Sequence, residues 1–347
     1  MRVLAFLVPL AAGAAEFPPE SAGREISGEL IAVDHVNRKG TLRLDRTEAQ
    51  QNHEYDLPLP FTLLPYGKVM YRGAYADLRH VPIGTHLTGL FFARDAKSPK
   101  PVFDGALRLE DDFSRLTRLK KTWRVDAVEL EKQRLVVTGV VEGGPADAKP
   151  TILRVVPATR VWKGRTIGGL KDLAPGQKVL ANLTECTLWG PGRCLDVWID
   201  EESRALARDQ QLETHKQDQR LRGLAAWIDD VDNKNEIVTA TIFDHVDPSL
   251  LKDLRVKNHV AAAVAEESLR TYDQGNDKRF GPVLEIKSVP AVPGCSGVRL
   301  SLVMHLIPDL QLIREAAARP GAPPVDVDEE RFFTVPERIG DYSCADF

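Results

Sequence analysis

The chain lacks most of the features that usually reveal an activity. It contains no H-E-x-x-H, no G-x-S-x-G and no G-x-x-x-x-G-K-[ST], which are the local signatures of zinc peptidases, serine hydrolases and P-loop nucleotide-binding proteins. The net charge of −4 gives no electrostatic footprint for nucleic acid. No segment approaches the roughly 18 uninterrupted apolar residues that a membrane span needs. We therefore expect no nucleic-acid partner, no membrane span, no bound metal and no cofactor.

The first residues read "MRVLAFLVPLAAGAAEF". Arg2 precedes an apolar run that ends at Leu10, and small residues follow at 12–14. This is the pattern of a secretory signal peptide over residues 1–15, and a short buried strand or helix is the alternative. No cysteine follows the cleavage site, so a lipid anchor is not indicated. We expect the mature chain to be secreted or periplasmic.

Cysteine is scarce, with Cys186, Cys194, Cys295 and Cys344 as its only occurrences. An even number suits full pairing in an oxidising compartment. In "CTLWGPGRC" the residues 190–192 form a strong turn signal, which predicts a hairpin with the first two cysteines opposed and joined as a disulfide. The other two then pair by elimination. A zinc site is the rival interpretation, but the C-x2-C spacing of structural zinc is absent.

A repeated pattern runs through the chain. "GELIAVDHV" returns as "GLAAWIDDV", and a weaker copy, "WRVDAVELE", lies between them. This alignment matches Val33 with Val128 and Ile228. A second landmark, Asp-Leu, ends at Leu78 and Leu173, and the two spacings agree, since 128 − 33 and 173 − 78 are both 95. A fixed spacing of this kind predicts tandem units.

Each unit reads as mainly β. Alternating apolar residues form a hairpin, and a strand after a turn is followed by a partner strand. Five or six short strands in about 80 residues suit a small OB-like β-barrel, with a two-sheet sandwich as the alternative. The predicted divisions are a signal peptide at 1–15, β-barrel units at 24–109, 122–200 and 223–306, helical linkers at 110–121 and 201–222, and a helix with a C-terminal tail at 307–347.

The two linkers differ in character. In "EDDFSRLTRLKK", the residues Phe113, Leu116 and Leu119 form a narrow apolar stripe that is expected to pack on a barrel. The second linker is mostly polar and is expected to act as a spacer. The acidic pairs at 111–112 and 201–202 lie where a strand meets a helix, so helix capping explains them before catalysis does.

Three weaker candidates for chemistry are better explained as turns. His80 and His86 flank a turn and are not expected to bind a metal. "DDVDNKNE" has only two of the ligand positions of a calcium loop, and Asn235 replaces its sharp-turn glycine. The aspartates of the Asp-Leu landmarks, Asp77, Asp172 and Asp253, recur with a turn and are expected to stabilise it.

The order of a strand, a Val-Asp turn, a strand and then an Asp-Leu-x-x-Gly turn resembles a family of small barrel domains of unknown function found in exported bacterial proteins. "GGLKDLAPGQKV", with Asp172, Leu173 and Gly176, matches best. The first unit departs by inserting residues before Gly84, and the third has Lys257 and an asparagine in place of the glycine. The resemblance covers nearly the whole mature chain. It implies a fold and a compartment but no activity.

Function is expected in the variable hairpins that follow the long strand of each unit, because insertions in repeats tend to collect on one face. The candidate binding residues there are Lys97, Trp189, Tyr272, Arg279 and Phe280. The sequence favours an exported, non-catalytic protein with a binding or spacer role at the cell envelope, where the partner is an envelope protein or a polysaccharide. The alternative is a hydrolase whose site lies between barrels, with two carboxylates or a Ser–His pair converging in a polar cleft.

Overall fold

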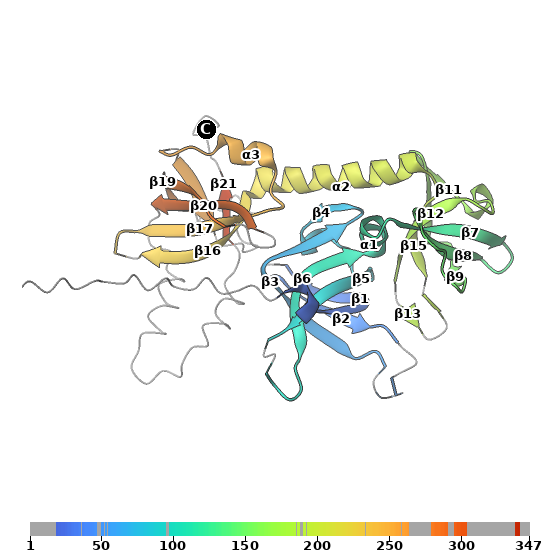
Figure 1. The fold of residues 1–347 in the computed structure, drawn as a ribbon. Coiled ribbons are helices and arrows are strands. Elements are labelled where there is room, and N and C mark those ends of the chain that lie inside the picture. The colour runs from blue at the N-terminus through green and yellow to red at the C-terminus, as the bar shows by residue number, and fades with distance from the viewer. Residues whose placement is uncertain are drawn as a thin grey trace, which may run out of the picture.

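The structure is a computed structural model. It describes residues 19–35, 37–46, 50–51, 53, 55–94, 97–184, 186–187, 190–191, 193–232, 234–257, 259–263, 279–290, 295–303 and 337–340. The protein is mainly β, with 52% strand and, in these ranges, three α-helices. Three β units follow one another along the chain, and the long helix α2 (Glu201–Arg222) runs past all of them (Figure 1).

The first unit is a six-stranded sheet in the order β2-β1-β5-β6-β3-β4, in which β2 also pairs with β3. Its elements are η1 (Glu20–Ala22), β1 (Arg24–Asp34), β2 (Lys39–Leu44), β3 (Pro58–Tyr71), β4 (Ala74–Ala76), η3 (Leu78–His80), β5 (His86–Ala93) and β6 (Phe103–Asp111). β3 and β6 are parallel, and the other pairs are antiparallel. Leu30, Leu42, Phe91 and Leu109 are fully buried in its core.

The second unit is an open seven-stranded sheet in the order β11-β10-β15-β12-β7-β8-β9. Its elements are β7 (Lys121–Glu129), β8 (Arg134–Val141), β9 (Thr151–Arg154), β10 (Arg160–Lys163), β11 (Thr166–Gly168), η4 (Leu170–Asp172), β12 (Lys178–Leu183) and β15 (Cys194–Trp198), with a small pair formed by β13 (Cys186–Thr187) and β14 (Gly190–Pro191). Here too one pair, β10 with β15, is parallel.

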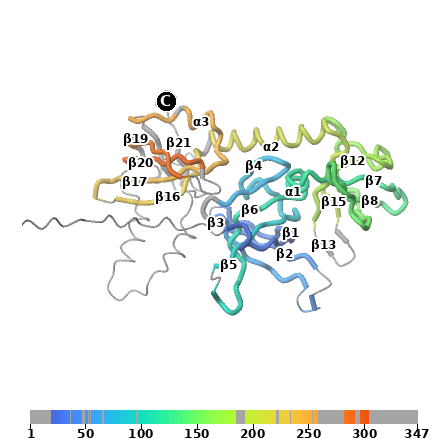
Figure 2. Tube along the Cα trace, in the orientation of Figure 1, coloured from blue at the N-terminus to red at the C-terminus, as the bar shows by residue number. Residues whose placement is uncertain are grey.

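The third unit is a closed barrel in the order β16-β17-β20-β19-β18-β21. Its elements are β16 (Leu224–Asp232), β17 (Ile237–Phe243), α3 (Pro248–Asp253), β18 (His259–Ala263), β19 (Arg279–Ser288), β20 (Cys295–Val303) and β21 (Glu337–Gly340). All of its pairs are antiparallel. The trace in Figure 2 shows these strands together at the end of the molecule farthest from β7 and β8.

The prediction of three β-barrels is therefore wrong, because among the described strands only those of the third unit form a closed barrel. In the second unit the chain leaves the sheet after Arg154 and returns at Arg160. Pro157 lies in this gap and has no N–H for a strand ladder, so one continuous strand cannot form there. The third unit closes, but without the parallel pair that the first two units share.

The spacing of the first landmark is confirmed for two units and wrong for the third. Val33 pairs with Gly40 and Val128 with Leu135, and each hairpin has a bulge at the same place, three residues earlier. In the third unit the bulge falls after Ile228 itself. The equivalent of Val33 is therefore Val231, three residues beyond the predicted match.

The second landmark also shifts by three residues. The 3-10 turns η3 and η4 begin at Leu78 and Leu170, so their spacing is 170 − 78 = 92 rather than 95. Asp77 precedes its turn and accepts the N–H of the residue two positions ahead. Asp172 instead ends its turn and accepts the N–H of Gly169. The two aspartates are not equivalent, although each stabilises its own turn.

Helix α1 (Asp112–Arg118) packs as its apolar stripe predicts, but against the next unit. Phe113 and Leu116 are buried together with Leu180, Trp198 and the helix α2 residue Ala207. Leu119, the third residue of the predicted stripe, lies just beyond the helix and is 40% exposed. α1 therefore forms the apolar part of the contact between the first and second units.

Candidate functional site: the buried polar contacts that join the units

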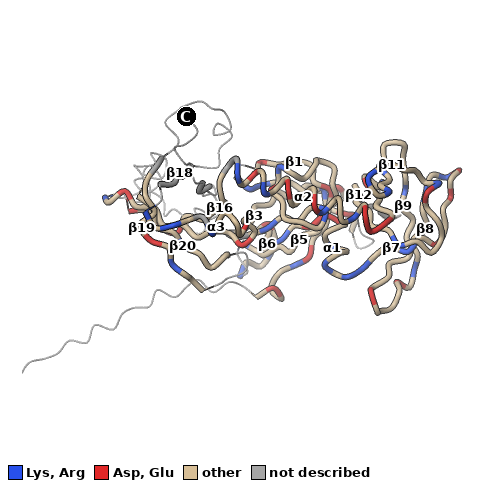
Figure 3. The backbone as a smooth tube through the Cα atoms, turned by 90° about the horizontal axis from the view of Figure 1, so that it is seen from above, with Lys and Arg blue, Asp and Glu red and all other residues tan. Residues whose placement is uncertain are grey.

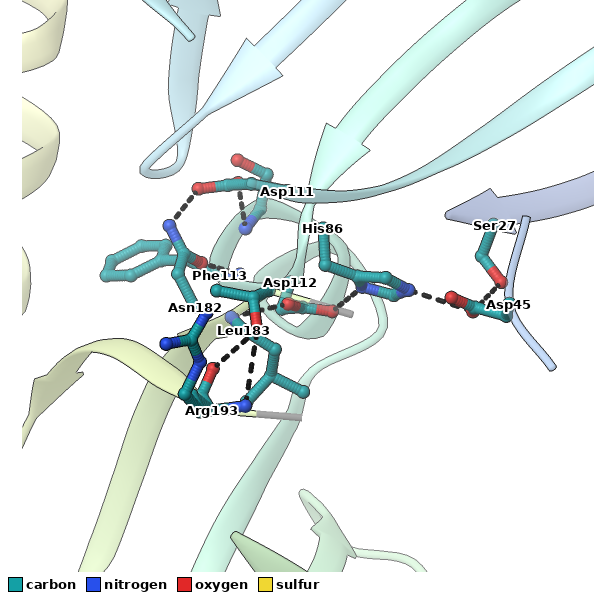
Figure 4. A network of polar contacts seen from close by, with 11 residues as sticks. Ser27, Asp45, His86, Asp111, Asp112, Phe113, Asn182, Leu183 and Arg193 are labelled. Carbon is teal, nitrogen blue, oxygen red and sulfur yellow. Dashed lines mark hydrogen bonds and ion pairs between the residues drawn. The ribbon is translucent and has the colours of Figure 1, made fainter. Parts of the chain in front are cut away.

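A buried carboxylate lies where the first unit meets the second. Asp111 is fully buried, caps helix α1 by accepting the N–H of Ser114, and also accepts the N–H of Arg72. From the second unit, the Asn182 side chain donates to Asp111 at 2.7 Å and accepts the N–H of Phe113 at 2.9 Å (Figure 4). Burial raises the pKa of Asp111 to about 6, although these hydrogen bonds oppose the shift.

His86 lies beside it, between two carboxylates. Its Nδ1 is 2.8 Å from Asp112 Oδ1 and its Nε2 is 2.9 Å from Asp45 Oδ2. The Ser27 hydroxyl also donates to Asp45, and the second oxygen of Asp112 accepts the N–H of Leu183 from the second unit. A neutral imidazole has only one N–H, so two carboxylate partners favour the doubly protonated ring. The chain of contacts links β1, β5, α1 and β12 (Figure 4).

This arrangement contains the residue types of a hydrolytic triad without its geometry. In such a triad the imidazole accepts the hydroxyl proton and one carboxylate orients the ring. Here the Ser27 hydroxyl donates to Asp45, both ring nitrogens of His86 face carboxylates, and the histidine is only 6% exposed. A Ser–His pair is therefore not formed among these residues, and their contacts link the first unit to the second.

A second ionic contact crosses the same junction. The Asp196 side chain is 2% exposed and accepts from Arg160 at 2.7 Å and from the Trp162 ring nitrogen at 2.6 Å, both within the second unit. Arg72 of the first unit reaches it at 3.4 Å and lies over the ring of Trp198. These donors offset the desolvation cost of burying the negative charge of Asp196.

Helix α2 contacts the units through a regular stripe. Five of its residues, four positions apart, are between 2% and 7% exposed: Ser203, Ala207, Gln211, His215 and Gln219. Residues at this spacing lie on one helix face. The prediction of α2 as a polar spacer did not include this face. The signal was present, because these positions carry no formal charge in a helix rich in charged residues.

The end of this stripe holds the third unit. His215 Nε2 is 2.8 Å from the main-chain oxygen of His245, which follows strand β17. The amide of Gln219 donates to the same oxygen at 3.0 Å, and its own oxygen accepts the N–H of Asp247 at 2.6 Å. The segment that leads into helix α3 is thus bound to α2 through its main chain.

Three histidines and a tyrosine gather at this point. The ring of His215 lies 5.7 Å from that of His245 and 6.3 Å from that of His80 in η3, measured between centroids. Tyr75 of β4 lies 5.7 Å from His245, and its main-chain oxygen accepts from Gln211 at 3.2 Å. Burial lowers the pKa of His215 to about 4 and also lowers the pKa of His245. We call this group the histidine junction.

Arg38 extends the junction from the turn between β1 and β2. Its φ of 53° is left-handed, and its guanidinium lies 4.9 Å from the ring centroid of Phe243 in the third unit. It donates to the main-chain oxygen of Gly67 at 2.5 Å. Burial lowers the pKa of Arg38 to about 10, and the charge of Asp77 opposes the shift. A cavity of about 40 Å³ lies beside these residues and His245.

A shallow groove of about 870 Å³ lies where the β10–β11 hairpin meets the start of α2. Its charged residues contact one another, Lys163 with Asp172 at 3.0 Å and Arg165 with Glu202 at 3.8 Å. Asp200 caps α2 and accepts the N–H of a glycine in the hairpin. These polar groups thus serve the fold, and the groove presents no chemistry that identifies a ligand.

The structure corrects one of the cysteine predictions. Cys194 is a free, buried thiol, and burial raises its pKa. The strand register places Cys194 opposite Leu183 and Cys186 opposite Pro191. The predicted Cys186–Cys194 disulfide is therefore wrong, because the turn of the hairpin falls earlier than the Gly-Pro-Gly sequence suggested. The side chain of Cys295 and all of Cys344 lie outside the described residues, and their pairing stays a prediction.

The five predicted binding residues are distributed as follows. Lys97 is exposed in the connection between β5 and β6. Arg279 and Phe280 begin strand β19 rather than lying in the hairpin before it. Trp189 and Tyr272 fall outside the described residues, as does the helix predicted after the third unit. A binding role for these residues therefore stays a prediction.

Other kinds of site find no support where the structure describes the chain. Within those ranges, no group of three or more His, Cys, Asp or Glu is placed to hold a metal ion. In the same segments, no helix is sufficiently long and apolar to cross a membrane. Basic and acidic residues are interspersed along the units (Figure 3). Comparisons with protein-family models, curated proteins and solved structures find no match.

Proposed function

We propose that the protein is a non-catalytic spacer that holds three β units in a rigid row. The observation that carries this proposal is the buried stripe of α2, which contacts each unit in turn. Ala207 packs beside the second unit, Gln211 binds the first, and Gln219 binds the third. A helix of 22 residues is about 33 Å long, so α2 sets a fixed separation along the row.

The junctions explain why the row is rigid. A flexible linker exposes its main chain and makes few contacts, whereas here main-chain groups of one unit bind side chains of another. Asp112 accepts the N–H of Leu183, and Gln219 binds two main-chain groups beside β17. Leaving such buried groups unpaired costs about 1–3 kcal/mol each, which opposes bending at either junction.

We infer further that the first two units are OB-like. Each unit begins with a hairpin, and a later strand pairs with the first strand of that hairpin: β5 with β1 in the first unit, and β12 with β7 in the second. The last strand of each unit then runs parallel to the strand that follows the hairpin, which is β3 for β6 and the β10 part of a divided strand for β15. A partly open five-stranded barrel of this order is the OB type. The gap around Pro157 divides the third strand of the second unit into β9 and β10.

The proposal also places the protein outside the cytoplasm, at the cell envelope, with an envelope protein or a polysaccharide as partner. Its support is the signal-peptide pattern of residues 1–15, which lie outside the described ranges. Cell fractionation together with N-terminal sequencing of the recovered protein tests it. A mature chain that begins near residue 15 supports export, and an intact Met1 in the cytoplasmic fraction contradicts it.

Energy transfer between dyes at the two ends of the row tests rigidity. Lys132 in the second unit and Lys234 in the third are exposed turn residues, and an unnatural amino acid at each position leaves the native cysteines untouched. We expect a narrow distance distribution at pH 7.5, and a broad one would overturn the spacer proposal. Gln219→Ala should broaden the distribution, because it removes the two bonds that Gln219 makes with the third unit.

Gln217→Ala is the matched control for that variant. Gln217 lies one half-turn away on α2, is exposed, and bonds only to Glu213 of the same helix. The same substitution at this position should leave the distance distribution unchanged. Equal broadening by both variants would show that α2 responds to any change in sequence, and that its buried stripe does not fix the units.

A further inference from the structure

We propose that the histidine junction is an acid-sensitive latch, which holds the third unit against the rest of the row near neutral pH and releases it when the histidines take up protons. The inference rests on the proposed spacer function in one respect, since the row must be rigid at neutral pH for the latch to have a closed state.

The geometry of the ring nitrogens carries the proposal. His215 is 5% exposed and the His245 side chain 11%. The Nδ1 atoms of both rings are buried and have no hydrogen-bond partner. His215 Nε2 faces the main-chain oxygen of His245 at 2.8 Å, so a second proton on His215 would place an N–H and a positive charge at its Nδ1. The nearest carboxylate oxygen to His245 Nδ1, from Asp244, is 3.7 Å away, and a buried cation without an acceptor is costly.

Charged groups face the junction from all three sides. From α2 these are Lys216, Asp218 and Arg220; from the first unit, Arg38, Lys68, Asp77 and Arg79, with Tyr75 and His80 as further titratable groups; from the third unit, Asp244 and Asp247. The carboxylates already have cationic partners. Asp218 lies 3.5 Å from Arg79, Asp244 lies 3.9 Å from Lys68, and Asp247 lies 3.9 Å from Arg220. Asp218, which favours a proton on His215, is thus already paired. Asp244 Oδ1 is buried without a hydrogen-bond partner and favours a proton on His245, but burial outweighs it and the pKa of His245 is still lowered.

The direction of the pH effect follows from the pKa of His215, which burial lowers from 6.5 to about 4. The closed junction favours the neutral ring of His215, whereas in the open junction the ring is solvated and has an ordinary pKa. The stability that His215 contributes to the closed state is complete above about pH 6.5 and is lost as the pH falls toward 4. The lowered pKa of His245 acts in the same direction.

The junction between the first and second units responds in the opposite way. Burial raises the pKa of Asp111 to about 6, so the folded state there favours the protonated carboxyl, and its contribution to stability grows as the pH falls toward 3.8. His86 already lies between two carboxylates, where a positive charge is compensated. Mild acid should therefore release the third unit alone, and the other junction serves as an internal reference.

Energy transfer tests the latch in the full-length protein at pH 7.5 and 4.5. One dye pair at Lys132 and Lys234 spans the histidine junction, and a reference pair at Lys100 and Lys132 spans only the first two units. We expect the first distance to change, with a midpoint between pH 4 and 6.5, while the second stays constant. A narrow, unchanged distribution for the first pair overturns the latch alone. A broad distribution at pH 7.5 overturns the spacer and the latch together.

Variants identify the groups that respond. His215→Gln keeps an amide N–H for the main-chain oxygen of His245 but cannot take up a proton, and His245→Phe keeps a ring in the cluster. The double variant should remain closed at pH 4.5, and His215→Gln alone should move the midpoint to lower pH. His53→Gln is the control, because His53 is exposed. Circular dichroism reports whether each variant is folded. If the double variant is folded, a transition like that of the wild type overturns the proposal. If the double variant is not folded, the single variant decides, and a midpoint that His215→Gln leaves unchanged overturns the proposal.

Discussion

The carboxylate of Asp112, in the first turn of α1, accepts the main-chain N–H of Leu183, the last residue of β12, at 2.9 Å. The two residues are 71 positions apart, and the bond joins the helix that closes the first unit to a central strand of the second. The other oxygen of the same carboxylate contacts His86. One side chain thus couples the fold of the first unit to the position of the second.

Asp112→Asn should destabilise the protein by about 1–3 kcal/mol. The amide oxygen can still accept the N–H of Leu183, but no negative charge remains beside His86 on that side. Urea unfolding measures the change. Asp104→Asn is the control, because Asp104 pairs with the more exposed Arg94, and such pairs contribute about 0–1 kcal/mol. An equal loss in both variants would mean that Asp112 has no special role.

Local pattern was sufficient to predict much of each unit. The alternation in "ELIAVDHV" predicts strand β1, and the strands after the Asp-Leu turns begin as expected at His86, Lys178 and His259. The helical segments at 112–118 and 201–222 were also visible, because acidic residues start them and basic residues end them. Strand and helix periodicity are properties of neighbouring residues, which is why a single sequence contains them.

The contacts between units could not be predicted in this way. Arg72 meets Asp196 across 124 positions, and β16 pairs with β21 across a similar distance in the chain. No local pattern specifies such partners. In the third unit, sequence similarity also gave the wrong register. "GLAAWIDDV" aligns with the first hairpin, yet its bulge lies three residues later. The position of a bulge depends on cross-strand pairing, which spacing alone does not encode.

Asp111→Asn should change the pH dependence of stability. The raised pKa of Asp111, about 6, means that the wild type gains stability relative to the variant as the pH falls between that value and 3.8. The relative gain should be about 2 kcal/mol between pH 6.5 and 4.5, since one proton per pH unit corresponds to about 1.4 kcal/mol. The histidine junction is present in both proteins and cancels in the difference. A difference that is independent of pH would contradict the raised pKa.

Cys194 should resist alkylation in the folded protein. It is 1% exposed, and its raised pKa leaves almost no thiolate at pH 8. Iodoacetamide followed by peptide mass spectrometry should therefore label Cys194 only after denaturation. Cys194→Ser should cost about 1–3 kcal/mol, because it places a hydroxyl among apolar side chains. A peptide that links Cys186 to Cys194 in a non-reducing digest would contradict the free thiol.

Phe113→Ala should loosen the contact between the first two units more than any change at Leu119. Phe113 is 3% exposed, packs edge-on against Trp198 at 4.9 Å between centroids, and lies between the two units and α2. Removing a buried ring leaves a cavity and costs about 3–5 kcal/mol. Leu119 belongs to the same apolar stripe of the sequence but is 40% exposed, so Leu119→Ala should cost much less, on the order of 0.5 kcal/mol. Thermal unfolding of both variants measures the difference. Because the ring contacts residues of the second unit, Phe113→Ala should also broaden the distance distribution between dyes at Lys100 and Lys132. An unchanged distribution would show that the hydrogen bonds of Asp111 and Asp112 hold this junction without the aromatic contact.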